Sequence, residues 1–435
     1  MTENNSKTAE IRRMARTDEP AANALLGSLL LDLFSLKAEA IRINHDQYSL
    51  NSLNGFFDAD GQSFFFKFHQ EDGEEAMSGE YYRADILARA GLPVDQPLYM
   101  SVLPGEQILI YRRRSDPRFS DVLRALDLSP DPAAESMAVA AEQELSAKVL
   151  SVYLESLHDV TPQDVAAEPI HRLFYERLVD PYSGAIPGGR YKSFYVDQRF
   201  DLPGADLNWA AFSKARVVIN GRRYSHSFAE LFHLASVWLR PDRLADAGGV
   251  VAHGDAHNAN VWYTQTDGAA HLSYFDPAFA GQNVPTLLAE VKTTFHNIFA
   301  HPLWLYDPAE AAERYSGRAR YEDGTLFLET DWTLSAVRRK LLDVKADTMW
   351  RPLLGALKAR DLLPQDWRRV IRLALFLCPT LVMNIRAGAS THNPTSSLIA
   401  IVMAVMVGSE PETGDDLVSR FLDRIDPFLD DVSQL

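Results

Sequence analysis

The chain is poor in cysteine and in long apolar runs. Cys378 is the single cysteine among 435 residues, so a disulfide within the chain is impossible. We therefore expect a reducing compartment, the cytoplasm. The longest apolar run, Leu398 to Val407, is too short to span a bilayer and predicts a buried helix. The polar start, Met1 to Ser6, has no signal-peptide core.

Positive charge is also scarce. The chain has 43 Lys and Arg residues against 59 Asp and Glu residues, which gives a formal net charge of −16. This balance argues against a nucleic acid or an anionic membrane as a partner. A hydrophobic fraction of 46% is enough for a sizeable core, and the length suggests two or three domains.

The segment from His253 to Asn260, together with Asp276, carries the strongest functional signal. Asn260 follows Asp255 by five residues, and Asp276 comes sixteen residues later. Apolar runs around them indicate strand, loop, strand, turn and strand. In such a layout an Asp orients a hydroxyl while an Asn and a second Asp hold Mg²⁺ on a nucleotide's phosphates. Mg²⁺ takes oxygen ligands, which suits both residue types. Ordinary turn residues between strands are the alternative.

The spelling His-Gly-Asp-x-His-x-x-Asn resembles the aminoglycoside phosphotransferase and choline-kinase-like family, which has a protein-kinase-like fold. The resemblance covers about residues 45 to 115 and 140 to 300, and residues 301 to 435 match only in being helical. Asp-Pro-Ala at Asp276 resembles the fructosamine kinases of the same superfamily. The family implies an ATP- and Mg²⁺-dependent enzyme that phosphorylates a hydroxyl of a small molecule.

The resemblance also implies a role for each loop residue. Asp255 would orient the hydroxyl and accept its proton, and Asn260 and Asp276 would bind Mg²⁺. His253 and His257 would support the loop structurally. A pseudokinase that binds nucleotide and serves as an interaction protein is the rival interpretation.

We expect an α+β fold of two lobes. The small lobe would be an antiparallel sheet of five strands with one helix, and the large lobe would be mostly helical. The expected boundaries are a helical extension at 1–44, the small lobe at 45–114 and the large lobe at 115–435. Turn signals at about 161–225 indicate an insertion in the large lobe, which includes a hairpin at 217–224 with an Asn220-Gly221 turn. Further hairpins are expected at 320–328 and at 55–68, where residues 58–61 form the turn.

Lys67 and Glu80 are the candidate ion pair of the small lobe. Lys67 lies in the aromatic strand 63–68, where a lysine is costly unless it has a partner. Glu80 follows thirteen residues later, in a helix expected from 74 to 90. The order of strand lysine and helix glutamate is that of the pair that aims a kinase lysine at the α- and β-phosphates.

The phosphate-covering loop is the weakest part of the pattern, because a Gly-x-Gly-x-x-Gly motif is missing. Residues 50–55 contain one glycine, with Ser52 and Asn54 as candidate groups for the phosphates. A plain hairpin loop is the alternative. Tyr111 ends an apolar strand that would lead into the adenine-binding hinge.

The acceptor is not identified by the sequence. Aminoglycoside, amino sugar, antibiotic, sugar and amino alcohol all remain open, as do the choice of ATP or GTP and the oligomeric state. The net charge favours a polar or cationic acceptor. A group of acidic residues after Asp276 would line its cleft, although a solvated face is the alternative: Asp307, Glu310, Glu313, Glu322 and Asp323.

Overall fold

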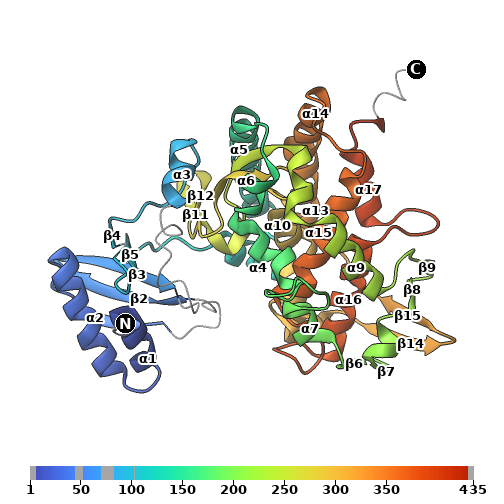
Figure 1. The fold of residues 1–435 in the computed structure, drawn as a ribbon, viewed down its shortest axis with the longest axis horizontal. Coiled ribbons are helices and arrows are strands. Elements are labelled where there is room, and N and C mark those ends of the chain that lie inside the picture. Colours follow the sequence, from blue (N-terminus) through green and yellow to red (C-terminus); the bar gives the residue numbers. More distant parts are fainter. Residues whose placement is uncertain (1–5, 45–51, 70–82, 102, 430–435) are drawn as a thin grey trace. The chain divides into compact units, whose positions relative to one another are not determined.

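The chain folds into two compact units in the structure, a computed structural model (Figure 1). The structure describes residues 6–44, 52–69, 83–101 and 103–429. The small unit comprises Met1–Ala88 and Val94–Asp116, and the large unit comprises Arg89–Pro93 and Pro117–Leu435. The α+β class that we expected is confirmed, with an antiparallel sheet in the first unit and mostly helices in the second.

The small unit is built on one five-stranded sheet of order β1-β2-β3-β5-β4. Every neighbouring pair of its strands is antiparallel, as predicted. Its elements are α1 (Lys7–Ala15), α2 (Glu19–Phe34), β1 (Glu39–Ile43), β2 (Ser52–Ala59), β3 (Gln62–His69), β4 (Tyr99–Ser101) and β5 (Ile108–Arg112), and α3 (Arg83–Arg89) leads into the large unit.

The hairpin β2–β3 sets which side chains share a face of this sheet. Asp60 and Gly61 both have positive φ, 50° and 74°, which is the conformation of the tight turns that match strand twist. Alternation then buries Phe64, Phe66 and Phe68 on one face. The predicted turn and both strands are confirmed.

Helices α1 and α2 share a hydrophobic core with the buried face of the sheet. Ile11 from α1 and Leu26, Leu29 and Leu30 from α2 belong to the same buried cluster as Phe66. Asp18 begins α2 by accepting the Ala21 N–H. The N-terminal segment, which we expected as an extension, therefore forms one compact unit with the sheet.

The large unit is mostly helical. Up to residue 247 its elements are α4 (Phe119–Leu128), α5 (Pro132–Ser156), α6 (Pro162–Ala166), η3 (Pro169–Leu173), η4 (Tyr175–Arg177), α7 (Gly189–Tyr195), β6 (Arg199–Leu202), β7 (Ala205–Asn208), α8 (Trp209–Phe212), β8 (Arg216–Ile219), β9 (Arg222–Arg223), α9 (Phe228–Trp238) and η5 (Pro241–Ala247). The segment that carries the candidate loop residues follows as β10 (Gly249–Ala252), η6 (Asn258–Asn260), β11 (Val261–Thr266), β12 (Ala269–Tyr274) and β13 (Gly281–Pro285). The rest is α10 (Val291–Thr294), η7 (Phe295–Phe299), α11 (His301–Leu305), α12 (Pro308–Arg314), β14 (Gly317–Glu322), β15 (Thr325–Thr330), α13 (Ala336–Val344), η8 (Lys345–Trp350), α14 (Arg351–Ala359), α15 (Trp367–Val382), α16 (Pro394–Gly408) and α17 (Leu417–Arg424).

The insertion at 161–225 pairs with a hairpin that lies about a hundred residues later in the chain. Strand β8 lies parallel to β15, which makes a four-stranded sheet of order β14-β15-β8-β9. Both hairpins of this sheet were expected from the sequence, including the Asn220-Gly221 turn, but their pairing was not. The sheet lies at one end of the large unit beside α16 (Figure 1).

The core of the large unit is formed around α15 and α16. Residues 398–407 lie in α16 and almost all are buried, so the predicted buried helix is confirmed. Cys378 is buried in α15. Within the part of the chain that the structure describes, no helix has the length and apolarity needed to cross a membrane.

Candidate active site

The catalytic loop lies between β10 and β11, as predicted. Gly254 is needed at its start because its φ is +77° and a Cβ there would lie 2.4 Å from the Phe279 carbonyl oxygen. The hairpin β11–β12 returns the chain to the loop. Asp276 follows β12 with a φ of +54°, an uncommon conformation for a residue with a side chain, and such strain is concentrated at functional sites.

His253 fixes the loop through its two ring nitrogens. Nε2 donates to the Phe275 carbonyl oxygen at 3.0 Å, and Nδ1 accepts the Asp255 N–H at 3.3 Å. These two bonds define a neutral imidazole protonated on Nε2. Burial lowers the pKa of His253, which favours the same neutral form. The ring therefore ties the start of the loop to the residue before Asp276.

Asn260 joins the two segments that carry the candidate metal ligands. Its side-chain Nδ2 donates to the Asp255 main-chain carbonyl oxygen at 2.9 Å. Its main-chain carbonyl oxygen accepts the Phe275 N–H at 3.0 Å. The side-chain nitrogen is thus used inside the loop, and the amide oxygen is the atom that suits a metal. Asp276 directly follows Phe275. The main-chain bond between Asn260 and Phe275 therefore ties the segment that carries Asn260 to the segment that carries Asp276.

These donors fit Mg²⁺ bound with a nucleotide. Among the described residues, no group of three or more His, Cys, Asp and Glu side chains could hold a metal ion by itself. Mg²⁺ on a nucleotide needs fewer protein ligands, because it keeps waters and takes phosphate oxygens in addition to one or two carboxylates or amides. Asn260 and Asp276 supply that oxygen set.

Asp255 lies against a buried lysine that the sequence analysis missed. Lys292 Nζ is 3.2 Å from Asp255 Oδ1, and the two side chains are 5% and 14% exposed. Burial opposes ionisation of Asp255, but the positive charge of Lys292 holds its pKa below the ordinary value. The carboxylate is therefore ionised at neutral pH.

One helical segment, α10 and the turn η7 that follows it, contacts three loop residues. Lys292 pairs with Asp255, the ring of His296 lies 5.6 Å from that of His257, and Asn297 Oδ1 accepts the Asn258 N–H at 2.7 Å. The sequence did carry a signal for this helix. Glu290, Lys292 and His296 are titratable residues in a stretch that also holds Val291, Phe295, Ile298 and Phe299, and all three are buried.

The imidazoles beside Asp255 are neutral at physiological pH. Burial lowers the pKa of His257 to about 4, although Asp255 opposes the shift. Burial and the neighbouring Lys292 lower the pKa of His296 well below its usual value. A neutral ring cannot serve as a general acid near pH 7. The geometry therefore fits the structural role expected for His257.

In the small unit, three sequence-predicted residues share the sheet face that points away from the α1–α2 core. Register pairs Asn54 with Lys67, Lys67 with Leu109, and Phe65 with Tyr111. Directly paired residues lie on the same face. Phe56, Phe65 and Tyr111 form a row of aromatic contacts there, with ring centroids 5.6 and 6.4 Å apart.

The structure corrects one expectation for the small unit, and another falls outside the described residues. Residues 52–55 were expected in a loop, and this was wrong: Ser52 and Asn54 lie in β2, which pairs with β3 along its full length. The Asn54 side chain is buried and accepts a hydrogen bond from Asn44 Nδ2 at 2.8 Å. Glu80 and most of the helix expected at 74–90 lie outside the described residues.

Three of the five acidic residues after Asp276 pair with arginines. Asp307 pairs with Arg124, Glu310 with Arg314, and Glu322 with Arg320. Glu322 and Asp323 lie at the turn of the β14–β15 hairpin. These pairs weaken the expectation of an acidic cleft, and the charge of the acceptor stays a prediction.

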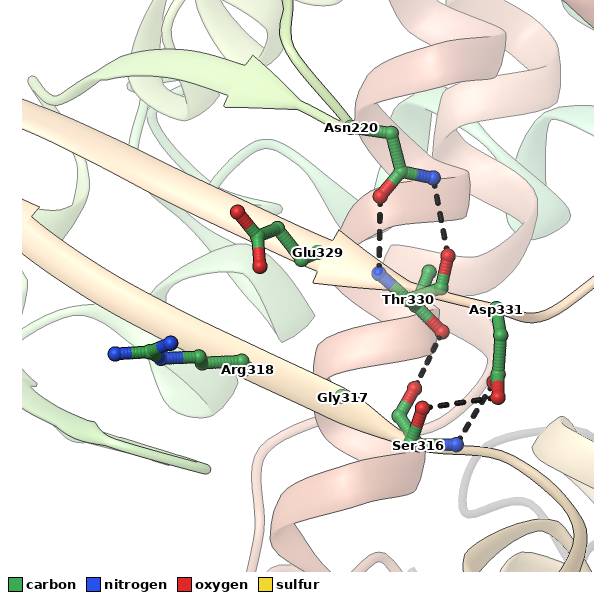
Figure 2. Close-up of a pocket in the computed structure, with 7 residues that line it drawn as sticks. All are labelled: Asn220, Ser316, Gly317, Arg318, Glu329, Thr330 and Asp331. Atoms are coloured by element: carbon green, nitrogen blue, oxygen red, sulfur yellow. Dashed lines mark hydrogen bonds between the residues drawn. The ribbon is translucent and has the colours of Figure 1, made fainter.

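A hollow of about 450 Å³ lies away from the catalytic loop, at one end of the β14–β15 hairpin (Figure 2). Its polar groups satisfy one another. The Asp331 carboxylate accepts from the Ser316 main-chain N–H and hydroxyl, and the Asn220 amide bonds to the main chain of Thr330 in both directions. Arg318 and Glu329 are exposed to solvent, so the hollow holds no buried polar group that calls for a ligand. The lining residues are Asn220, Ser316, Gly317, Arg318, Glu329, Thr330 and Asp331.

Comparisons with known proteins give matches among solved structures alone. No protein-family model matches the chain, and no curated protein sequence does. Aminoglycoside phosphotransferase APH(4)-Ia is 12% identical, with 88% of this chain and 98% of that chain covered and a TM-score of 0.45. An ethanolamine kinase of Plasmodium vivax is 8% identical, with 93% and 95% covered and a TM-score of 0.38. The macrolide 2'-phosphotransferase MphH of Brachybacterium faecium is 12% identical, with 81% and 97% covered and a TM-score of 0.33.

These matched structures are small-molecule phosphotransferases and kinases, the group that the catalytic loop resembles. The identities and TM-scores are low.

Proposed function

We propose that the protein is a phosphotransferase that uses ATP and Mg²⁺ to phosphorylate a hydroxyl of a small molecule. Phosphoryl transfer needs little covalent help from protein. It needs a nucleophile held in line and negative charge neutralised on the phosphates. The residues around Asp255 have the chemistry for both tasks.

Each residue has a defined part in this proposal. Asp255 orients the acceptor hydroxyl and receives its proton. Asn260 and Asp276 hold Mg²⁺, which when bound neutralises charge on the phosphates. Lys67, supported by Glu80, contacts the α- and β-phosphates. The adenine lies against the small-unit face that carries Tyr111, where the aromatic row of Phe56 and Phe65 offers an apolar surface.

The observation that carries the proposal is the bonding of the loop itself. Asn260 is tied to the main chain of Asp255 and of Phe275, and His253 is tied to both as well. The base and the two oxygen donors are therefore parts of one rigid arrangement. Ordinary turn residues between strands would not need a buried ionised carboxylate at this point.

An acceptor screen tests the proposal. Purified protein is mixed with Mg²⁺ and ATP and with single hydroxyl compounds, which include aminoglycosides, amino sugars, sugars, nucleoside-like antibiotics and amino alcohols. We expect ADP release that depends on one class of acceptor and a product that carries one phosphate. Tight binding of Mg²⁺ and ATP without turnover on any acceptor would instead support the rival, a pseudokinase that acts as an interaction protein.

A further inference from the structure

Lys292 is a buried cation placed against the carboxylate to which we assign the proton. Its side chain is 5% exposed, and its Nζ lies 3.2 Å from Asp255 Oδ1. Ion pairs at this depth contribute little net stability, because both charges lose their hydration. A buried lysine at this place therefore calls for a role other than holding the fold together.

The two oxygens of Asp255 differ in their surroundings. Oδ1 faces Lys292 and is inaccessible to solvent, and His257 Nε2 lies 3.9 Å from the same oxygen. The side chain as a whole is 14% exposed, and Oδ1 contributes nothing to that exposure. Oδ2 is thus the oxygen that can meet an acceptor hydroxyl.

The segment that carries Lys292 is fixed to the unit from both ends. Before Lys292, Glu290 accepts from the Tyr153 hydroxyl at 2.7 Å and pairs with Lys345 at 3.1 Å. After it, the Asn297 carbonyl oxygen accepts a hydrogen bond from Arg338, which is itself fully buried. A lysine held between two such anchors has little freedom to leave Asp255.

Residues 295–299 form a wider, π-helical turn that directly follows α10. Such turns are rare and are often found at functional sites. Here the turn carries His296 and Asn297, which contact His257 and Asn258 of the loop while Lys292 contacts Asp255. One helical segment thereby fixes the loop at three successive points.

We propose that Lys292 is the positioning residue of the catalytic base: it holds Asp255 Oδ1 inward and so presents Oδ2 to the acceptor hydroxyl. This inference rests on the proposed function of Asp255. Lys292 does not touch the acceptor in this assignment and acts through Asp255 alone. Its loss should therefore lower kcat and leave the KM for ATP nearly unchanged.

A double-mutant cycle between Lys292 and Asp255 tests this assignment. We expect Lys292→Met to lower kcat roughly 10- to 100-fold, the effect typical of losing the partner that orients a functional side chain. Lys292→Arg keeps the cation and should recover most of that loss. In an Asp255→Asn background, Lys292→Met should cause little further loss, because the two residues act as one unit.

Unfolding by urea gives a second readout that needs no acceptor. Lys292→Met leaves a buried carboxylate without its partner and should lower the urea midpoint. Adding Asp255→Asn removes that charge, so the urea midpoint of the double variant should be higher than that of Lys292→Met. If Lys292→Met does not fold, the double variant should. Lys340→Met is the matched control. Lys340 lies on α13 and pairs with Glu135 of α5 at 2.8 Å, so its loss should not alter kcat.

The outcomes separate the two claims. A wild-type protein that transfers phosphate to no acceptor defeats the proposed function. A wild-type protein that is active, with Lys292→Met equally active, defeats only the assignment of Lys292. Losses from Lys292→Met and Asp255→Asn that multiply in the double variant would also overturn it, since they would show independent action.

Discussion

At the scale of the residue, Asn260 and Asp276 are side chains whose chemistry can be tested one atom at a time. Each would contribute one kind of oxygen ligand to a hard cation. We predict that Asp276→Ala and Asn260→Ala both weaken binding of Mg²⁺ and ATP, and that Asp276→Ala does so more because it removes a full charge. Titration calorimetry with and without Mg²⁺ measures this. Tight, metal-dependent ATP binding that is unaltered in both variants would refute the metal assignment.

A second prediction at this scale concerns pH and His392. Burial lowers the pKa of His392 from 6.5 to about 4. The unfolded chain therefore binds a proton at this residue more readily than the folded chain does. Stability is unaffected above pH 6.5 and falls as the pH drops from there toward 4. The full loss is about 3 kcal/mol at 1.36 kcal/mol per pKa unit.

Urea unfolding at several pH values checks the His392 prediction. His392→Gln should make the free energy of unfolding less dependent on pH between about 6.5 and 4. His233→Gln is the control, because His233 is exposed on α9. Equal pH dependence in the wild type and in His392→Gln would contradict the assignment.

At the scale of the element, the helical turn at 295–299 holds the catalytic loop in place through Asn297. Asn297→Ala leaves the buried Asn258 N–H without its acceptor, at 2.7 Å in the wild type. We expect a loss of about 1–3 kcal/mol in the free energy of unfolding, the usual cost of such a group. Gln265→Ala, on the exposed end of β11, should change it by less than about 0.5 kcal/mol. Equal stability of the two variants would show that the loop does not depend on this turn.

The face of the small-unit sheet gives another prediction at this scale. Lys67 shares that face with Tyr111 and lies opposite the hydrophobic core. Lys67→Ala should raise the KM for ATP or lower kcat, and Glu80→Ala should do so less, because in this proposal Glu80 only positions the lysine. Lys7→Ala is the matched control. Lys7 lies on α1 of the same unit, pairs with Glu106 at 2.9 Å, and has no part in the proposed ATP site. ATP kinetics of Lys67→Ala that equal those of Lys7→Ala would count against the pair.

Local patterns were enough to predict many elements. Alternating aromatics and an Asp-Gly turn predicted β2 and β3, and the apolar runs around His253 and Asn260 predicted β10 and β11. Each of these signals arises from residues close together in sequence. The ends of β2 were misplaced because strand pairing, rather than the polar composition of residues 52–55, decides where that strand begins.

Contacts between distant segments could not be predicted in this way. Lys292 lies 37 residues after Asp255, and nothing local to either one indicates the ion pair. The parallel pairing of β8 with β15 joins segments about a hundred residues apart. Likewise, a single sequence does not show that Asp307 pairs with Arg124.

At the scale of the whole molecule, the two compact units carry different parts of the proposed chemistry. The small unit carries Lys67 on the sheet face opposite its helix-covered core, and the large unit carries the proposed base and metal ligands on a loop held by side-chain hydrogen bonds. The fold alone does not name the acceptor, because one fold carries many functions.

The most direct test of the central claim is acceptor-dependent phosphate transfer by wild-type protein and Asp255→Asn, measured side by side. The substitution keeps the size of the side chain and removes the carboxylate. We predict that kcat falls roughly 10²- to 10⁴-fold, the usual worth of general base catalysis, while the affinity for Mg²⁺ and ATP changes little. Transfer by Asp255→Asn at the wild-type rate would contradict the account, because the carboxylate at the centre of this site would then have no part in the reaction.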